Sequence, residues 1–225
     1  MDFATVFMEV YPSLFSGLQM TLKASLLAIF IAFFLGLGSC ILGMSKIKPL
    51  AWISKLYIWI IRGTPFIVQL FIVKYGVPQV VSMFVDGFNI SIFQAAVGTL
   101  SLNAGAYMSE IFRGGIEAVD PGQMEAASSL GLPRSRAMIK VILPQALRIS
   151  IPSLCNQFII TLKDSSLAQV IGLQELFYQG KIYVGRTFKS FETYIIVGCV
   201  YLVIITVLSF VIKHIERKTK YGQKS

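Results

Sequence analysis

The chain has 225 residues, of which 55% are hydrophobic and only 14% charged, well below the roughly 25% of charged residues in soluble domains. Too few polar side chains are present to coat a water-soluble globule, and 17 Phe, 9 Tyr and 2 Trp exclude a disordered or fibrous chain. The composition therefore predicts an all-α membrane protein that crosses the bilayer several times. No cleavable signal peptide is expected, because Asp2 and Glu9 make the first residues acidic rather than basic.

Five segments are candidate membrane spans within one domain, 1–225, at about residues 16–44, 50–76, 87–112, 146–165 and 191–213. The first, third and fifth contain long uncharged runs. The second is interrupted by Lys55, Arg62 and Pro65. The fourth has a short apolar run between Arg148 and Lys163, and it is long enough only if its polar ends lie in protein-lined space.

Basic residues indicate the orientation of these spans. No Lys or Arg precedes Lys23, whereas basic residues follow the first, third and fifth spans at Lys46, Lys48, Lys55, Arg134, Arg136, Lys140, Arg148, Lys213, Arg217, Lys218, Lys220 and Lys224. This predicts an external N-terminus and a cytoplasmic C-terminus. The exceptions are Lys181, Arg186 and Lys189, which would face outside. The net charge of +9 thus marks cytoplasmic edges and does not indicate nucleic acid.

A polar loop at about 116–144 separates the third and fourth spans. The turn at 120–122 predicts a short helix that begins at Gln123 or Met124, and Gly131 can end it in a left-handed conformation. A second short helix, 135–142, is expected to stop before Pro144. Such a loop either lies on the lipid surface or docks to a soluble partner.

Several blocks resemble known sequences. Glu125-Ala126-Ala127 with Gly131 and Leu143-Pro144 resembles the EAA loop of bacterial ABC importer permeases. Further blocks, within a resemblance that spans about 21–216, are similar to the polar amino acid permeases of that superfamily, at 62–65, 68–71, 101–107, 110–113, 122–125, 143–146 and 163–167.

The resemblance implies the type I ABC importer fold, with five-span subunits paired as a homodimer or with a similar chain in the bacterial cytoplasmic membrane. It also implies an extracytoplasmic amino-acid-binding protein and a cytoplasmic ATPase dimer that holds ATP and Mg. The ATPase-coupling residues would be Glu125, Ala126, Ala127, Gly131 and Arg134. The chain has no G-x-x-x-x-G-K-[ST] phosphate loop, so we expect neither a catalytic residue nor a cofactor in it.

Polar residues within the spans are the candidate substrate pathway, because a charge at the bilayer centre costs at least about 2.5–3.5 kcal/mol. Residues 55, 62 and 69 are spaced to share one helix face. Acid and amide groups together suit an ammonium, and the candidates are Thr64, Gln69, Asn103, Tyr107, Glu110, Asn156, Thr161 and Asp164. Hydrogen bonds between helices are the alternative role. Arg62 and Lys163 are possible cations of the pathway. Each has a structural alternative: Arg62 would hold the broken second span together, and Lys163 would form an ion pair with Asp164.

The substrate is predicted from a weaker resemblance. Residues 175–177, Gln179, 186–188 and Phe191 resemble the cystine permease branch, so we expect L-cystine first, with glutamine, arginine or histidine as alternatives. The rival class is an ion-coupled carrier or a channel, in which Glu110 and Asp164 would relay protons. No metal site is expected, since Cys40, Cys155 and Cys199 are far apart in apolar stretches.

Overall fold

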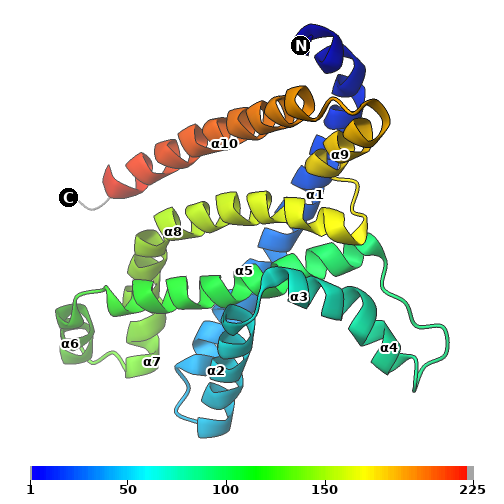
Figure 1. Ribbon diagram of the computed structural model, residues 1–225. Coiled ribbons are helices and arrows are strands. Elements are labelled where there is room, and N and C mark those ends of the chain that lie inside the picture. The colour runs from blue at the N-terminus through cyan, green and yellow to red at the C-terminus, as the bar shows by residue number, and fades with distance from the viewer. Residues whose placement is uncertain (1, 222–225) are drawn as a thin grey trace.

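The computed structural model describes residues 2–221, with side chains for residues 2–214. The described chain consists of helices and the loops that join them, with no strand (Figure 1). Its elements are α1 Phe3–Gly43, α2 Lys48–Gly63, α3 Phe66–Phe71, η1 Ile72–Gly76, α4 Val77–Val81, α5 Ile92–Glu117, α6 Pro121–Ser129, α7 Arg134–Ala137, η2 Met138–Ile142, α8 Leu143–Asp164, η3 Ser165–Ile171, α9 Leu176–Thr187 and α10 Ser190–Tyr221.

Three helices of the described chain are long and apolar enough to cross a membrane, namely Phe3–Gly43, Arg134–Ile171 and Ser190–His214. A fourth candidate is the pair formed by α2 and Phe66–Val81, which bends by 109°. Helix α5 has 26 residues and falls outside this set. At 1.5 Å per residue it is about 39 Å long, enough to cross the bilayer core. The five-span count rests on adding α5, whose polar face lowers its hydropathy.

Helix α5 lies at the centre of the molecule, packed against α1 and α8 (Figure 1). Small residues allow the close approach: Gly36 of α1 faces α5 so closely that an added Cβ would lie 2.7 Å from Met108 Cβ. On the other side, a Cβ on Gly115 would lie 2.8 Å from the Ala146 carbonyl oxygen of α8. Such small-residue contacts are typical of helices that associate within a membrane.

Helix α9 packs beside the N-terminal half of α1. Its N-cap is Glu175, a fully buried carboxylate that accepts hydrogen bonds from the Phe177 and Tyr178 amides at 2.9 and 2.7 Å. The Tyr201 hydroxyl of α10 donates a third bond at 2.9 Å. Burial raises the pKa of the Glu175 carboxyl, and the amide donors oppose this shift. The Tyr183 hydroxyl of α9 donates to Glu9 of α1, and α9 with the basic segment 181–189 lies at the same end as the N-terminus (Figure 1).

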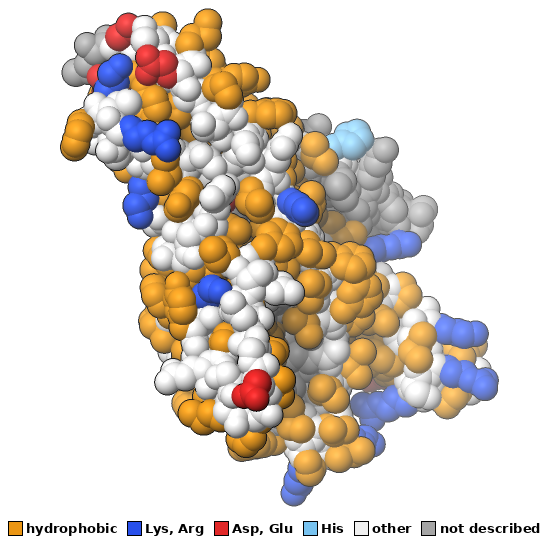
Figure 2. All heavy atoms as spheres, turned by 90° about the vertical axis from the view of Figure 1, so that its right-hand side faces the viewer, with side chains coloured by type: hydrophobic (Ala, Val, Ile, Leu, Met, Phe, Trp, Pro, Cys, Tyr) orange, Lys and Arg blue, Asp and Glu red, His pale blue; other side chains and the backbone are white. Residues whose placement is uncertain are grey.

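The opposite end carries α6 and the C-terminal end of α10, on the left of Figure 1. The loop after α4 and the helix α9 lie on the right. Figure 2 shows the molecule from the right-hand side of Figure 1, and hydrophobic side chains cover much of this face. Such exposed apolar surface is typical of contact with lipid or with a second subunit. Which of the two ends faces the outside stays a prediction.

The predicted stop before Pro144 is wrong. Helix continues from Arg134 through Pro144 to Ile171, because a wider π-helical turn precedes the proline. In that turn the Leu143 amide donates to the Met138 carbonyl, five residues back. The same turn precedes Pro78, where the Val77 amide donates to the Ile72 carbonyl. A π turn fits here because proline lacks an N–H and its ring clashes with the carbonyl four residues back in a regular α-helix.

The prediction that residues 55, 62 and 69 share one helix face holds for Lys55 and Arg62, which lie on α2 and line one cavity, and is wrong for Gln69. Helix α2 ends at Gly63 and α3 begins at Phe66, with Thr64 and Pro65 extended between them. Proline disfavours the helical conformation of the residue before it, so Thr64 takes φ −122° and ψ 147°. The resulting bend turns Gln69 inward, where it is buried, and leaves Arg62 exposed.

Candidate functional site

The break between α2 and α3 is closed by one side chain. The Gln69 Nε2 atom donates to the Ile61 carbonyl at 2.7 Å, to the Thr64 carbonyl at 3.0 Å and to Thr64 Oγ1 at 2.9 Å. A broken helix frees backbone carbonyls, and each one left unsatisfied within a bilayer costs several kcal/mol. The bonds of Gln69 satisfy two of them. Its Oε1 accepts a bond from Asn103 Nδ2 of α5 at 3.1 Å, which ties the break to the central helix.

A cavity of about 420 Å³ opens at this break. Three parts of the chain supply its polar lining: Thr64 in the break between α2 and α3, Asn103 and Tyr107 of α5, and Gln157 and Asp164 of α8. Pro65, Phe66 and Ile160 supply apolar contacts. Four of the predicted pathway residues therefore meet here, namely Thr64, Asn103, Tyr107 and Asp164. Gln157 joins them and was not among the predicted site residues, although it shares a helix face with Asp164, seven residues on.

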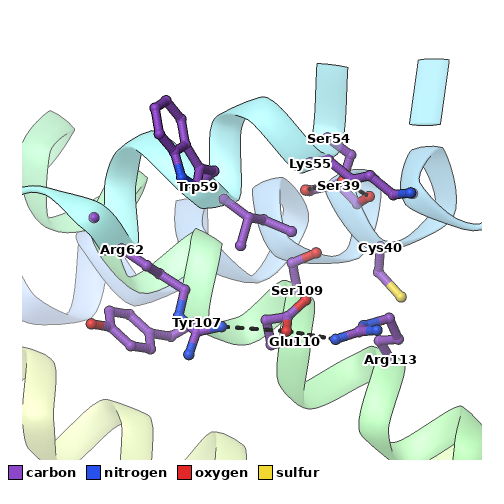
Figure 3. A pocket seen from close by; sticks show the side chains of 13 residues that line it. Ser39, Cys40, Ser54, Lys55, Trp59, Arg62, Tyr107, Ser109, Glu110 and Arg113 are labelled. Carbon is purple, nitrogen blue, oxygen red and sulfur yellow. Dashed lines mark hydrogen bonds and ion pairs between the residues drawn. The ribbon is translucent and has the colours of Figure 1, made fainter. Parts of the chain in front are cut away.

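A second cavity, of about 590 Å³, lies between α1, α2 and α5 (Figure 3). Glu110 lies between two guanidinium groups, 3.3 Å from Arg62 and 2.7 Å from Arg113. The Arg62 guanidinium also stacks over the Tyr107 ring at 5.3 Å. Tyr107 lines both cavities, so it is the wall between the amide-rich and the ion-paired spaces. Arg62 thus links α2 to α5, whereas the break in the second span, which it was expected to hold together, is bridged by Gln69.

Three of the other predicted residues lie elsewhere. Thr161 is buried and donates to the Gln157 carbonyl of its own helix at 2.9 Å. Asn156 is exposed and outside both cavities. Lys163 lines a different cavity, of about 300 Å³, with Tyr194 and Tyr201. The Lys163–Asp164 ion pair is not formed: the ion pairs among the described side chains all involve Glu110 or Arg113. Consecutive helix residues point about 100° apart, which separates the two side chains.

The loop of the EAA resemblance forms a compact projection at the far end of α5. Asp120 caps α6 by accepting from the Gly122 amide at 2.7 Å, so the helix begins at Pro121, two or three residues before the predicted start at Gln123 or Met124. Gly131 has φ +79°, the predicted left-handed end. Its amide donates to Ser128, and that of Leu132 donates to Ala127. This pair of bonds is a Schellman motif.

One face of α6 is anchored and the other is free. Ala127 is buried, and Met124 packs with Ile142 and Ala146 at the start of α8. Gln145 also donates to Gln123 Oε1 at 3.2 Å. The remaining predicted coupling residues are exposed, Glu125 and Ala126 on α6 and Gly131 and Arg134 just beyond it, together with Leu130, which is 84% exposed. The anchored face therefore joins α6 to the start of α8, one of the helices that line the 420 Å³ cavity.

Comparisons with known proteins agree with this architecture. Residues 28–221 match the family described as binding-protein-dependent transport system inner membrane component. The chain is 38% identical over 220 residues to the arginine transport system permease protein ArtQ of Bacillus subtilis, with 98% of each chain covered. It is 39% identical over 211 residues to the L-cystine transport system permease protein TcyB of the same organism, covering 92% of this chain and 87% of the relative.

A solved structure resembles the chain at similar length. A crystal structure of an amino acid ABC transporter with histidines matches with a TM-score of 0.90 and 42% identity, covering 97% of this chain and 99% of the other. Nearly equal identity to an arginine and a cystine permease leaves the particular amino acid open. The chain belongs to the binding-protein-dependent transport system inner membrane components, and it is the multi-pass membrane subunit, rather than the ATPase, of an amino acid ABC importer.

Proposed function

We propose that this subunit carries a polar amino acid through the 420 Å³ cavity at the helix break, with L-cystine as the first substrate to test. The observation that carries the proposal is the meeting of one carboxylate and two amides from α5 and α8, Asp164, Asn103 and Gln157, in a space of the size typical of small-molecule sites. Carboxylate and amide side chains are uncommon within a membrane unless they line a pathway or form contacts between helices.

The lining fits an amino acid zwitterion. Asp164 offers a negative charge to the ammonium, and the amide and hydroxyl groups can donate to the carboxylate. L-Cystine has a second zwitterionic end, and Arg62 lies just beyond Tyr107 in the adjoining cavity. The resemblance at 175–191 supports cystine as well. Arginine, glutamine and histidine are the competing substrates, since each has the same zwitterionic group.

The driving force would come from partners. In this proposal two cytoplasmic ATPase subunits bind ATP and Mg, and they press on the free face of α6 around Glu125 and Leu130. An extracytoplasmic binding protein delivers the amino acid at the α9 end, and a second permease subunit, identical or similar, completes the assembly. The chain would span the membrane five times with its N-terminus outside. ATP and loaded binding protein each favour one access state, since a ligand shifts an equilibrium only by differential affinity.

The test is uptake of radiolabelled L-cystine by the assembled transporter with its cognate binding protein, competed by unlabelled arginine, glutamine and histidine. Asp164→Asn should lower uptake at least tenfold, as expected for the loss of about 1.5–3 kcal/mol of charge-assisted hydrogen bonding. Lys163→Gln is the matched control, because the neighbouring side chain lines another cavity and should leave uptake unchanged.

Two results would contradict the proposal. Equal uptake in Asp164→Asn and wild type, with assembly preserved, would remove the cavity from the pathway. Uptake of labelled arginine, glutamine or histidine by the same transporter, without uptake of labelled L-cystine, would keep the pathway and remove cystine as the substrate.

A further inference from the structure

We propose that Gln69 is a positioning residue that fixes the Asn103 side-chain amide, so that the Asn103 carbonyl oxygen faces the 420 Å³ cavity as an acceptor for the substrate ammonium. The inference rests on the proposed function, because it concerns how the same cavity selects its substrate. Gln69 is absent from the cavity lining, so it acts on the substrate only through Asn103.

The orientation of Gln69 is forced by its surroundings. One terminal atom of its side chain lies 2.7 Å from the Ile61 carbonyl oxygen and 3.0 Å from the Thr64 carbonyl oxygen. Backbone carbonyls can only accept hydrogen bonds, so this atom must be the amide nitrogen. Thr64 Oγ1 lies 2.9 Å from the same atom and gives its own proton to the Ile60 carbonyl at 2.8 Å. It too can act only as an acceptor toward Gln69.

The orientation of Asn103 follows from that of Gln69. Once the Gln69 nitrogen faces the broken helix, its oxygen faces α5. The terminal atom of Asn103 that lies 3.1 Å from this oxygen must then be a donor, the Nδ2 amide. The two terminal atoms of an asparagine side chain point in different directions, so Oδ1 is left for the cavity side. The bent backbone at Thr64–Pro65 therefore sets, through two amides, the polarity of one wall of the cavity.

The consequence is selectivity for an ammonium. Asn103 and Asp164 both line the cavity. With Asn103 in this orientation, its Oδ1 atom and the Asp164 carboxylate can each accept a hydrogen bond from the ammonium, which has three donors to offer. If Asn103 turned over, its NH₂ group would face the ammonium and repel it. A hydroxyl in place of the ammonium would be indifferent to this change, because it can donate or accept.

The test measures this preference on the assembled transporter in lipid nanodiscs, without the binding protein. L-Cystine, L-arginine, L-glutamine and L-histidine are each paired with the analogue in which a hydroxyl replaces the α-ammonium. Half-saturating concentrations come from ligand-dependent thermal stabilisation. The variants are Gln69→Met, Asn103→Leu and the double variant, and Lys163→Gln is the control that should match wild type.

The preference for the amino acid should fall about tenfold in Asn103→Leu, as expected for one charge-assisted hydrogen bond. In Gln69→Met it should fall at least twofold, because a freely turning amide presents its oxygen about half of the time. The double variant should equal Asn103→Leu, since Gln69 acts through Asn103. A purely structural Gln69 would lower thermal stability but leave the preference of its single variant at the wild-type value.

The outcomes separate the two proposals. If wild type is stabilised equally by amino acid and hydroxy analogue, or if Gln69→Met keeps the full wild-type preference, the positioning role is wrong while the transport pathway stands. If the effects of the two single variants multiply in the double variant, Gln69 does not act through Asn103. If no amino acid stabilises wild type, the cavity is not a substrate site, and both proposals fail.

Discussion

Replacing Gly131 perturbs the coupling loop through the backbone alone. Its φ of +79° lies in the left-handed region, and an added Cβ would meet no atom within 4 Å. The cost of an alanine there is therefore conformational, about 1–2 kcal/mol, with more for the β-branched valine. This is equivalent to about a 5- to 30-fold loss in the population of the Schellman-capped loop for alanine. We expect ATP-driven uptake to fall in Gly131→Ala and to be abolished in Gly131→Val.

Two matched variants isolate this cause. Gly131→Asn should retain most activity, since asparagine tolerates the left-handed conformation. Gly114→Ala should act like wild type, because Gly114 is helical and an added Cβ there also has open space. The assay is uptake together with the stimulation of ATPase activity by loaded binding protein. Normal stimulation in Gly131→Val, or equal losses in the asparagine and valine variants, would refute the argument that loop geometry couples ATP to transport.

Three further predictions concern packing and topology. Gly115→Ala should lower the thermal stability by about 1–3 kcal/mol, because its Cβ would lie 2.1 Å from Ser150 Oγ, whereas Gly98→Ala on the same helix should be neutral; equal melting temperatures would contradict this. Glu175→Ala should cost about 2–4 kcal/mol in thermal unfolding, since α9 loses its cap and the Tyr201 hydroxyl its acceptor; a change below 1 kcal/mol would count against this. In a cysteine-free background, a cysteine at Phe88 should react with an impermeant maleimide only from outside and one at Leu130 only from the cytoplasm, and the reverse labelling would invert the predicted topology.

The sequence predicted the local features whose causes are local. Gly131 and Pro133 end a helix through their own backbone preferences, which do not depend on the surrounding structure, so the left-handed end of α6 is as predicted. The spacing of Asn103 and Tyr107 on one helical face likewise brings both residues to one cavity.

The predictions that proved wrong concern the backbone geometry around a proline. A proline in sequence does not reveal whether the helix breaks, as at Pro65, or continues through a π turn, as at Pro144. The error at Pro65 led to the wrong face for Gln69, because seven-residue spacing places side chains together only on an unbroken helix. The bonds from Gln69 to Ile61 and Thr64 form across the bend, and they could not be read from periodicity.

The central claim is that an amino acid passes through this subunit at the expense of ATP hydrolysed by its partners. The most direct measurement is radiolabelled amino acid uptake into liposomes that contain the permease and its ATPase subunits, with loaded binding protein outside and Mg-ATP inside. We predict uptake that requires ATP and the loaded binding protein together and is unchanged when a proton ionophore collapses the pH gradient. Uptake by the permease alone, driven by a proton gradient without ATP, would contradict the account and support a carrier in which Glu110 and Asp164 relay protons.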